Sequence, residues 1–110
     1  MRSLVDTVRG FRSLRVLVIG DAMLDSYVEG TAARLCSEGP VPVVSTRSER
    51  HLPGGAANTA ANLRALGADV MFLGIVGNDH GGSLLQSALE SARVDAGWLV
   101  VDAEATTLRK

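Results

Sequence analysis

Cysteine is almost absent from this chain, since Cys36 is the only one among 110 residues. A single cysteine cannot form an internal disulfide, and no group of cysteines and histidines has the spacing of a zinc site. The chain is nevertheless long enough to bury a core as one domain without a disulfide or a structural metal. These features favour a protein of the reducing cytoplasm.

An excess of charge of either sign is missing as well. The 11 basic and 12 acidic residues are interspersed and give a net charge of −1, which excludes a basic stripe for nucleic acid and a polybasic membrane patch. No apolar run approaches the roughly 20 residues needed to span a bilayer. Residues 1–15 have helical apolar spacing without the continuous apolar segment of a signal peptide. We expect a soluble protein that binds neither nucleic acid nor membrane.

Two common phosphate-binding motifs are also absent. The chain has neither the GxGxxG spacing of a dinucleotide fold after its first apolar run nor a GxxxxGK sequence followed by Ser or Thr. A catalytic triad is not indicated, because His51 and His80 are single histidines in polar segments, where such residues are more often solvated. The sequence predicts no catalytic residue and no metal site in this chain.

Short apolar segments alternate with helical patterns along the chain. Uninterrupted apolar runs predict buried strands at residues 15–21, 70–77 and 98–101. Helical spacing predicts helices at residues 56–66 and 81–92, the first closed by Gly67. This order of elements predicts an α/β fold, with a parallel sheet covered on both faces by flanking helices.

Residues 26–50 interrupt the alternation. Pro42 would remove a hydrogen-bond donor from a central strand, so the apolar segment around it predicts an edge strand. We interpret residues 26–50 as a small β lid outside the main sheet, whose exposed strands need a ligand or a partner to cover them. Cys36 falls within this lid, where we expect no catalytic role.

Two carboxylates follow the first predicted strand. Asp21 and Asp25 lie where ligands gather in open parallel sheets, beyond the carboxyl ends of the strands. Each carboxylate can accept hydroxyl groups of a polyol, although Asp is also common in turns for local reasons. From these two residues alone, binding and turn formation remain equally open.

Gly54 and Gly55 stand directly before the first long predicted helix. A glycine pair lets a ligand approach the backbone N–H groups of a helix N-terminus, but it is also a common tight turn. Asn58 and Asn62 follow at i, i+4 spacing and share one helix face. Asn58 is nearer the helix start and can offer a donor and an acceptor to a sugar hydroxyl, whereas Asn62 is expected to brace neighbouring loops.

A longer motif emerges when these residues are taken together. Residues 54–60 read GGAANTA and are followed by Gly67 and Gly77. This pattern resembles the N-terminal signature of the ribokinase-like (PfkB) carbohydrate kinases, and the resemblance extends over residues 14–110. Within that family, residues 18–27, Arg34 with residues 37–44, and residues 53–58 together are most similar to the D-glycero-D-manno-heptose 7-phosphate kinase branch, although residues 35–37 and 39 depart from its usual lid sequence.

The resemblance implies that residues 1–110 form the N-terminal portion of one ribokinase-like domain, which binds a sugar or sugar phosphate beneath the lid. Carried over position by position, it implies substrate contacts from Asp21, Asp25, Gly54, Gly55 and Asn58. Arg34 in the lid is a candidate partner for a sugar phosphate. Asp79 lies in a glycine-rich turn similar to one of the family and is better suited to local structure than to substrate binding.

The same resemblance implies phosphoryl transfer from MgATP to a sugar hydroxyl in a longer parent protein. The aspartate base and anion hole of the family belong to a second signature, DTxGAGD, which these 110 residues do not contain. We therefore expect the chain alone to be inactive. Two alternatives stay open: a non-catalytic module that binds sugar or forms a homodimer through its lid strands, and a parent kinase for ribose, fructose 6-phosphate or a nucleoside.

Overall fold

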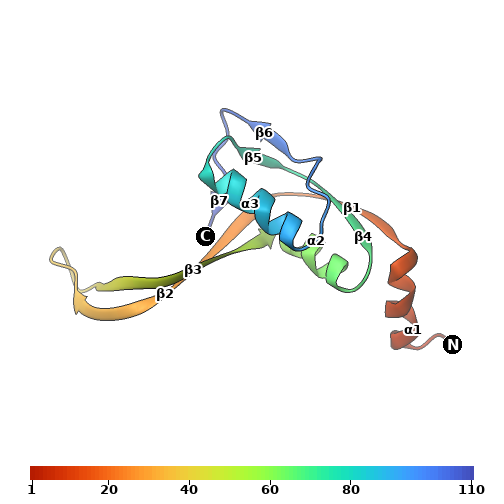
Figure 1. Ribbon diagram of the computed structural model, residues 1–110, viewed down its shortest axis with the longest axis horizontal. Coiled ribbons are helices and arrows are strands. Elements are labelled where there is room, and N and C mark those ends of the chain that lie inside the picture. The colour runs from red at the N-terminus through yellow and green to blue at the C-terminus, as the bar shows by residue number, and fades with distance from the viewer.

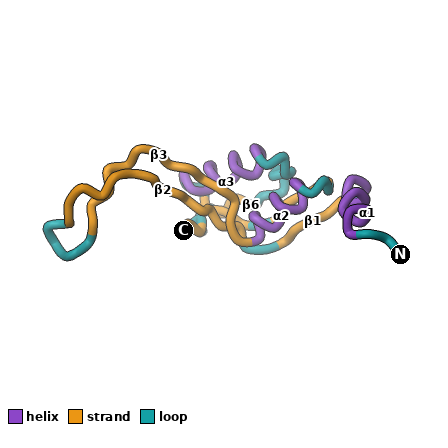
Figure 2. The backbone as a smooth tube through the Cα atoms, turned by 90° about the horizontal axis from the view of Figure 1, so that it is seen from below, coloured by secondary structure: helices purple, strands orange, loops and turns teal.

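A long β-hairpin projects from a body of helices and short strands in the computed structural model (Figure 1). The structure describes residues 1–110, apart from the side chain of Ala33. Its dimensions are 61 × 36 × 19 Å, and the hairpin and the N-terminal helix lie at opposite ends of the long axis (Figure 2). The fold is mixed α/β, with helices α1, α2 and α3 and three small sheets.

The chain begins with helix α1 (Leu4–Arg9), which continues into the 3-10 helix η1 (Gly10–Ser13). The hydroxyl of Ser3 accepts a hydrogen bond from the N–H of Asp6 over 3.1 Å and so caps the first turn. The helical start predicted from apolar spacing is confirmed. No helix in the described part of the chain is long and apolar enough to cross a membrane.

Strand β1 (Arg15–Ile19) pairs with strand β4 (Asp69–Leu73) in parallel, as predicted from the order of apolar runs. In this register Val16 lies opposite Val70 and Val18 opposite Phe72, and all four side chains belong to the core or pack against it. The alternate residues point to the other face, where Ile19 is 68% exposed. The prediction that β1 is covered on both faces is therefore wrong.

The apolar run at residues 70–77 forms two strands and not one. Strand β4 ends at Leu73, and strand β5 (Ile75–Gly77) pairs in parallel with strand β6 (Val100–Asp102). Gly74 separates them at a crowded point, because a Cβ atom there would lie 2.7 Å from the Phe72 ring and 2.9 Å from the carbonyl oxygen of Gly20. The chain changes its pairing partner at this glycine.

Helices α2 (Ala56–Ala65) and α3 (His80–Ser91) supply the rest of the core. Ala57 and Ala60 are buried on α2, where their small side chains permit close packing, and Leu85 and Leu89 are buried on α3. These side chains join Phe72 in one cluster. Gly67, with φ of 112°, follows the end of α2 as predicted.

The hairpin consists of strands β2 (Ala22–Leu35) and β3 (Pro42–Gly55), paired antiparallel along their whole length. It contains the predicted excursion at residues 26–50, but both strands continue into the body. Pro42 is the first residue of β3, a position that tolerates a missing N–H donor. The short strand β7 (Leu108–Arg109), which was not predicted, pairs in parallel with β2 beside the body.

Candidate functional site

A cavity of about 680 Å³ lies between the root of the hairpin and helices α2 and α3. Its walls combine apolar, aromatic and polar side chains, a composition that suits a small polar ligand. The hairpin contributes Asp25, Tyr27, His51, Leu52 and Pro53, and the helical side contributes Asn58, Ala61, Leu84, Ser87, Ala88, Ser91 and Ala92.

Asp25 supplies the carboxylate of this cavity. Its side chain is 23% exposed, and among the described residues its Oδ1 atom is a buried side-chain oxygen without a hydrogen-bond partner. Gly54 lies against this carboxylate, because a Cβ atom at Gly54 would stand 2.7 Å from Oδ1. The nearby ammonium of Lys110 is 3.9 Å from Oδ1. Because Asp25 lines the cavity, a ligand bound there could donate a hydroxyl group to this carboxylate.

Asp21 occupies a different place from Asp25. Its carbonyl oxygen accepts the N–H of Ala56 over 3.1 Å, so its backbone takes up the first donor of helix α2. Its exposed side chain lines a separate hollow of about 420 Å³ beside Gly74 and Ile75. The structure thus does not bring the two predicted aspartates into one cavity.

Gly55 makes the turn between the hairpin and helix α2. Its φ of 58° lies in the left-handed region, and a Cβ atom at this position would approach the Asp21 carbonyl oxygen to 2.9 Å. This conformation delivers Asn58 to the first turn of the helix, where it lines the same cavity as Asp25. Asn62, one turn further, is exposed and does not line that cavity. Its bracing role remains a prediction.

Arg34 lies far from this cavity within one chain. It is exposed near the tip of the hairpin, nine residues along β2 from Asp25. At about 3.3 Å per strand residue, that separation is roughly 30 Å. Arg34 therefore does not reach a ligand bound beside Asp25 in the same molecule.

Asp79 is the N-cap residue of helix α3. Its Oδ1 accepts the hydroxyl of Thr107 over 2.6 Å and the N–H of Gly82 over 2.8 Å, and its Oδ2 accepts the N–H of Thr107 over 3.0 Å. The Thr107 hydroxyl, then its N–H and that of Gly82, hold the pKa of Asp79 below its usual value. Asp79 thus ties the segment before β7 to the start of α3, in keeping with the structural role expected of it.

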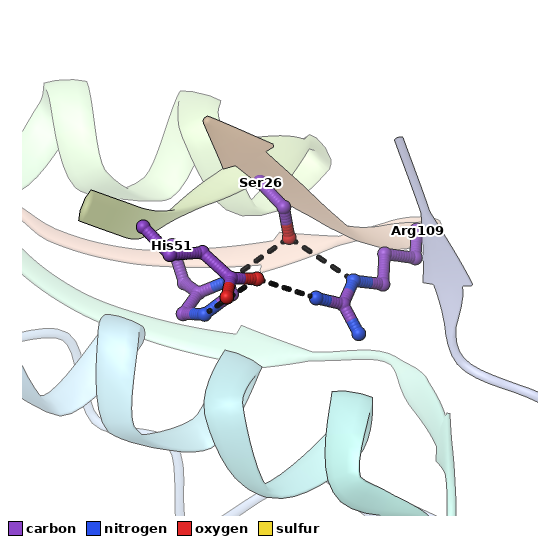
Figure 3. Close-up of polar contacts among 4 residues, drawn as sticks. Ser26, His51 and Arg109 are labelled. Carbon is purple, nitrogen blue, oxygen red and sulfur yellow. Dashed lines mark hydrogen bonds and ion pairs between the residues drawn. The ribbon is translucent and has the colours of Figure 1, made fainter. Parts of the chain in front are cut away.

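A group of four polar residues at the hairpin root was not predicted (Figure 3). Ser26 Oγ lies 2.9 Å from His51 Nδ1 and accepts from Arg109 Nε over 3.1 Å. Glu49 Oε1 accepts from an Arg109 terminal nitrogen over 3.0 Å and lies 3.4 Å from His51 Nε2. His51 is therefore not the solvated loop histidine that we expected. Apart from Glu49 and His51, which are two residues apart, the partners are separated by 25 to 83 residues, so no local pattern could indicate the whole group.

The described residues show neither a metal-binding cluster nor a common nucleotide-phosphate motif. Within them, no group of three or more His, Cys, Asp or Glu side chains is arranged to hold a metal ion. The glycine motifs that bind nucleotide phosphates are also absent from the sequence. We therefore derive no catalytic step involving MgATP from this chain.

Comparisons with known proteins place these observations in a family. Residues 13–110 match the model of the pfkB family of carbohydrate kinases. The chain is 46% identical over 89 residues to "Bifunctional protein HldE" of Hydrogenovibrio crunogenus, covering 81% of this chain and 18% of that protein. It is 41% identical over 99 residues to the protein of the same name from Pseudomonas aeruginosa, covering 90% of this chain and 21% of the relative.

Solved structures of carbohydrate kinases also resemble this chain in fold. The Arabidopsis thaliana ribokinase complexed with ribose and ATP matches with a TM-score of 0.63 and 26% identity, over 87% of this chain and 30% of that one. The chain thus spans about a fifth of the curated relatives and under a third of this solved structure. Because residues 13–110, nearly the whole chain, match the family model, the chain belongs to the pfkB family of carbohydrate kinases.

Proposed function

We propose that this chain is the sugar-binding part of an ATP-dependent carbohydrate kinase, and that the sugar binds in the cavity between the hairpin root and helices α2 and α3. In the longer protein, MgATP would supply the phosphoryl group and further segments would supply the catalytic base. A cytoplasmic location accords with this role and with the single cysteine.

The Asp25 carboxylate in the cavity wall is the observation that carries the proposal. Among the described residues its Oδ1 has no hydrogen-bond partner and only the Lys110 ammonium 3.9 Å away, so a ligand that donates to this carboxylate would offset the cost of its burial. A sugar hydroxyl is a suitable donor, and Asn58 lines the same cavity with an amide that can donate and accept. Gly54 serves this arrangement because any larger residue would collide with the carboxylate.

Heptose 7-phosphate is the substrate that we propose for the parent protein. Two observations support it: the lid and glycine motifs resemble the heptose 7-phosphate kinase branch, and the relatives named HldE are 41–46% identical. Asp21 remains a candidate for a substrate contact from its separate hollow. Arg34 remains a candidate for a substrate contact only if the hairpin of a second molecule lies over the cavity.

The proposal is tested by titrating the 110-residue chain with D-glycero-D-manno-heptose 7-phosphate and following backbone amide shifts by NMR. We expect saturable shifts around Asp25 and Asn58. Asp25→Asn keeps the size of the side chain but removes its charge, and it should weaken binding by about tenfold or more, the loss typical of a charged hydrogen bond.

Asp6→Asn is the matched control, because Asp6 is an exposed aspartate on helix α1, away from the cavity. It should bind the sugar phosphate as the unchanged chain does. Equal affinity of the Asp25→Asn variant and the unchanged chain would remove Asp25 from the site. Saturable binding of ribose or fructose 6-phosphate in preference to the heptose would retain the site but change the substrate.

A second candidate role is homodimer formation through the hairpin. Its strands extend beyond the body; Val28, Leu35 and Val44 are exposed on them, and Val41 is exposed in the loop just before β3. Apolar side chains on projecting strands favour association with another surface. Sedimentation of the chain and of a Val28→Glu, Val44→Glu variant tests this role. A dimer that persists unchanged in the variant would exclude the hairpin as the interface.

A further inference from the structure

Ser26, His51, Glu49 and Arg109 form a closed cycle of polar contacts at the hairpin root. Arg109 bonds both Ser26 and Glu49, and these two residues face the two nitrogens of the imidazole (Figure 3). Arg109 reaches them from strand β7, whose parallel pairing places it opposite Leu24 on β2. One residue late in the chain thus holds both strands of the hairpin root.

The directions of donation follow from the chemistry of the groups. Arginine has only donors, so Ser26 Oγ and Glu49 Oε1 both accept from Arg109. Ser26 keeps its own O–H to donate to Nδ1 of His51, while the negative charge of Glu49 favours a proton on Nε2. This assignment leaves neither nitrogen of His51 free to act as a base toward a ligand.

The same histidine lines the candidate sugar cavity. Its side chain is 20% exposed, and it follows Arg50 and precedes Leu52, the residue paired with Asp25 across the hairpin. His51 and Asp25 both line this cavity, although they come from neighbouring register positions of the hairpin. The orientation of the His51 ring therefore contributes to the shape of the cavity wall.

We propose that Arg109 is a positioning residue of the sugar pocket, which fixes the His51 ring in the cavity wall through Ser26 and Glu49. The inference rests on the proposed function, because it gives the ring a role in holding a sugar. Without Arg109, Ser26 and Glu49 lose their shared donor, and the imidazole can rotate and change its tautomer. A bound sugar must then restore the ring to one orientation, which lowers its affinity.

The test uses the 110-residue chain labelled with ¹⁵N at histidine. Long-range ¹H–¹⁵N spectra report which ring nitrogen carries the proton, with exposed His80 as an internal reference. We expect the unchanged chain to show one His51 tautomer, protonated at Nε2. Arg109→Gln should show a mixture of tautomers and bind heptose 7-phosphate about tenfold more weakly. Arg109→Lys, which can keep only the pair with Glu49, should fall between them.

Arg47→Gln is the control, since Arg47 is exposed on β3 and takes part in no ion pair found among the described residues. It should change neither the tautomer nor the affinity. If Arg109→Gln disturbs folding, Ser26→Ala removes only one hydroxyl and should release the ring in the same way. An Arg109→Gln chain with unchanged affinity, beside a weakened Asp25→Asn chain, overturns the positioning role and leaves the proposed function intact.

The spectra also distinguish the proposed sugar binding from the positioning of His51 by Arg109 when no sugar binds. If the unchanged chain binds no sugar, the proposed function fails and with it the role of the ring in sugar binding. A single Nε2–H tautomer that becomes mixed in Arg109→Gln supports the hold of Arg109 on His51 whatever the sugar result. A mixed tautomer in the unchanged chain contradicts that hold.

Discussion

The packed body and the projecting hairpin are held together by different forces. In the body, side chains such as Phe72, Leu85 and Leu89 are completely buried and join one apolar cluster. Along the hairpin, from residue 27 to residue 50, most side chains are exposed, and the two strands are joined chiefly by their backbone ladder. Stability therefore resides in the body, whereas the hairpin is free to use its side chains for recognition.

The largest expected effect comes from removing the centre of the body. Phe72→Ala should lower the free energy of unfolding by about 3–5 kcal/mol, because it deletes a fully buried ring and leaves a cavity. Urea denaturation followed by circular dichroism measures this loss. A domain at the low end of ordinary stability, about 5 kcal/mol, would be left with only about 0–2 kcal/mol.

Val44→Ala on the hairpin is the control for this change. Val44 is 47% exposed, so the substitution should alter the free energy of unfolding by no more than about 0.5 kcal/mol. Equal losses in the two variants would show that the hairpin contributes to the core as much as the body does, against the contrast drawn above.

A smaller effect is expected where the segment before β7 meets the body. The Thr107 hydroxyl accepts the buried N–H of Gly77 over 2.9 Å and donates to Asp79. Thr107→Val preserves the side-chain shape but leaves that N–H without a partner, which should cost about 1–3 kcal/mol in urea denaturation. Thr106→Val, at the exposed neighbouring residue, should be nearly neutral. A neutral Thr107→Val variant would mean that this contact does not anchor the segment.

The smallest effect concerns acid stability. The pKa of Asp79 is lowered from 3.8 in the folded chain, chiefly by the Thr107 hydroxyl. Its carboxylate therefore stabilises the fold fully above that value, and the contribution is lost as the pH falls through the lower folded pKa. As the pH falls below 3.8, unfolding measurements should show a steeper loss for the unchanged chain than for Asp79→Asn. Parallel curves for the two proteins would contradict this assignment.

The strands and helices of the body were largely predicted, because apolar runs and helical spacing within short segments indicate them. Apolar runs marked β1 and β4, and the alanine-rich segment closed by Gly67 marked α2. The break at Gly74 escaped prediction, since it depends on the Phe72 ring and on the Gly20 carbonyl from another strand. The exposure of Ile19 was not predicted either, because an apolar strand has the same sequence pattern whether one of its faces or both are covered.

The candidate site was predictable only in part. The glycine pair, Asp25 and Asn58 formed a recognisable motif; Asp25 and Asn58 line one cavity and Gly54 lies against the Asp25 carboxylate, whereas Gly55 makes the turn into α2. The separation of Asp21 from Asp25 depends on how β1 turns into β2, which no spacing reveals. His51 and Arg109 escaped prediction because the contact of His51 with Ser26 and both contacts of Arg109 depend on long-range pairing of strands.

The length of the hairpin makes it a lever. From Ser26, strand β2 continues for about ten residues to Leu35, which at about 3.3 Å per residue is an arm of roughly 33 Å. A rotation of only about 10° at the root would carry the tip through roughly 6 Å, by the geometry of an arm of that length. Arg109 bonds both strands at the root of the hairpin. A small change in the angle at the root, such as the loss of one of these hydrogen bonds would permit, therefore produces a larger displacement at the tip.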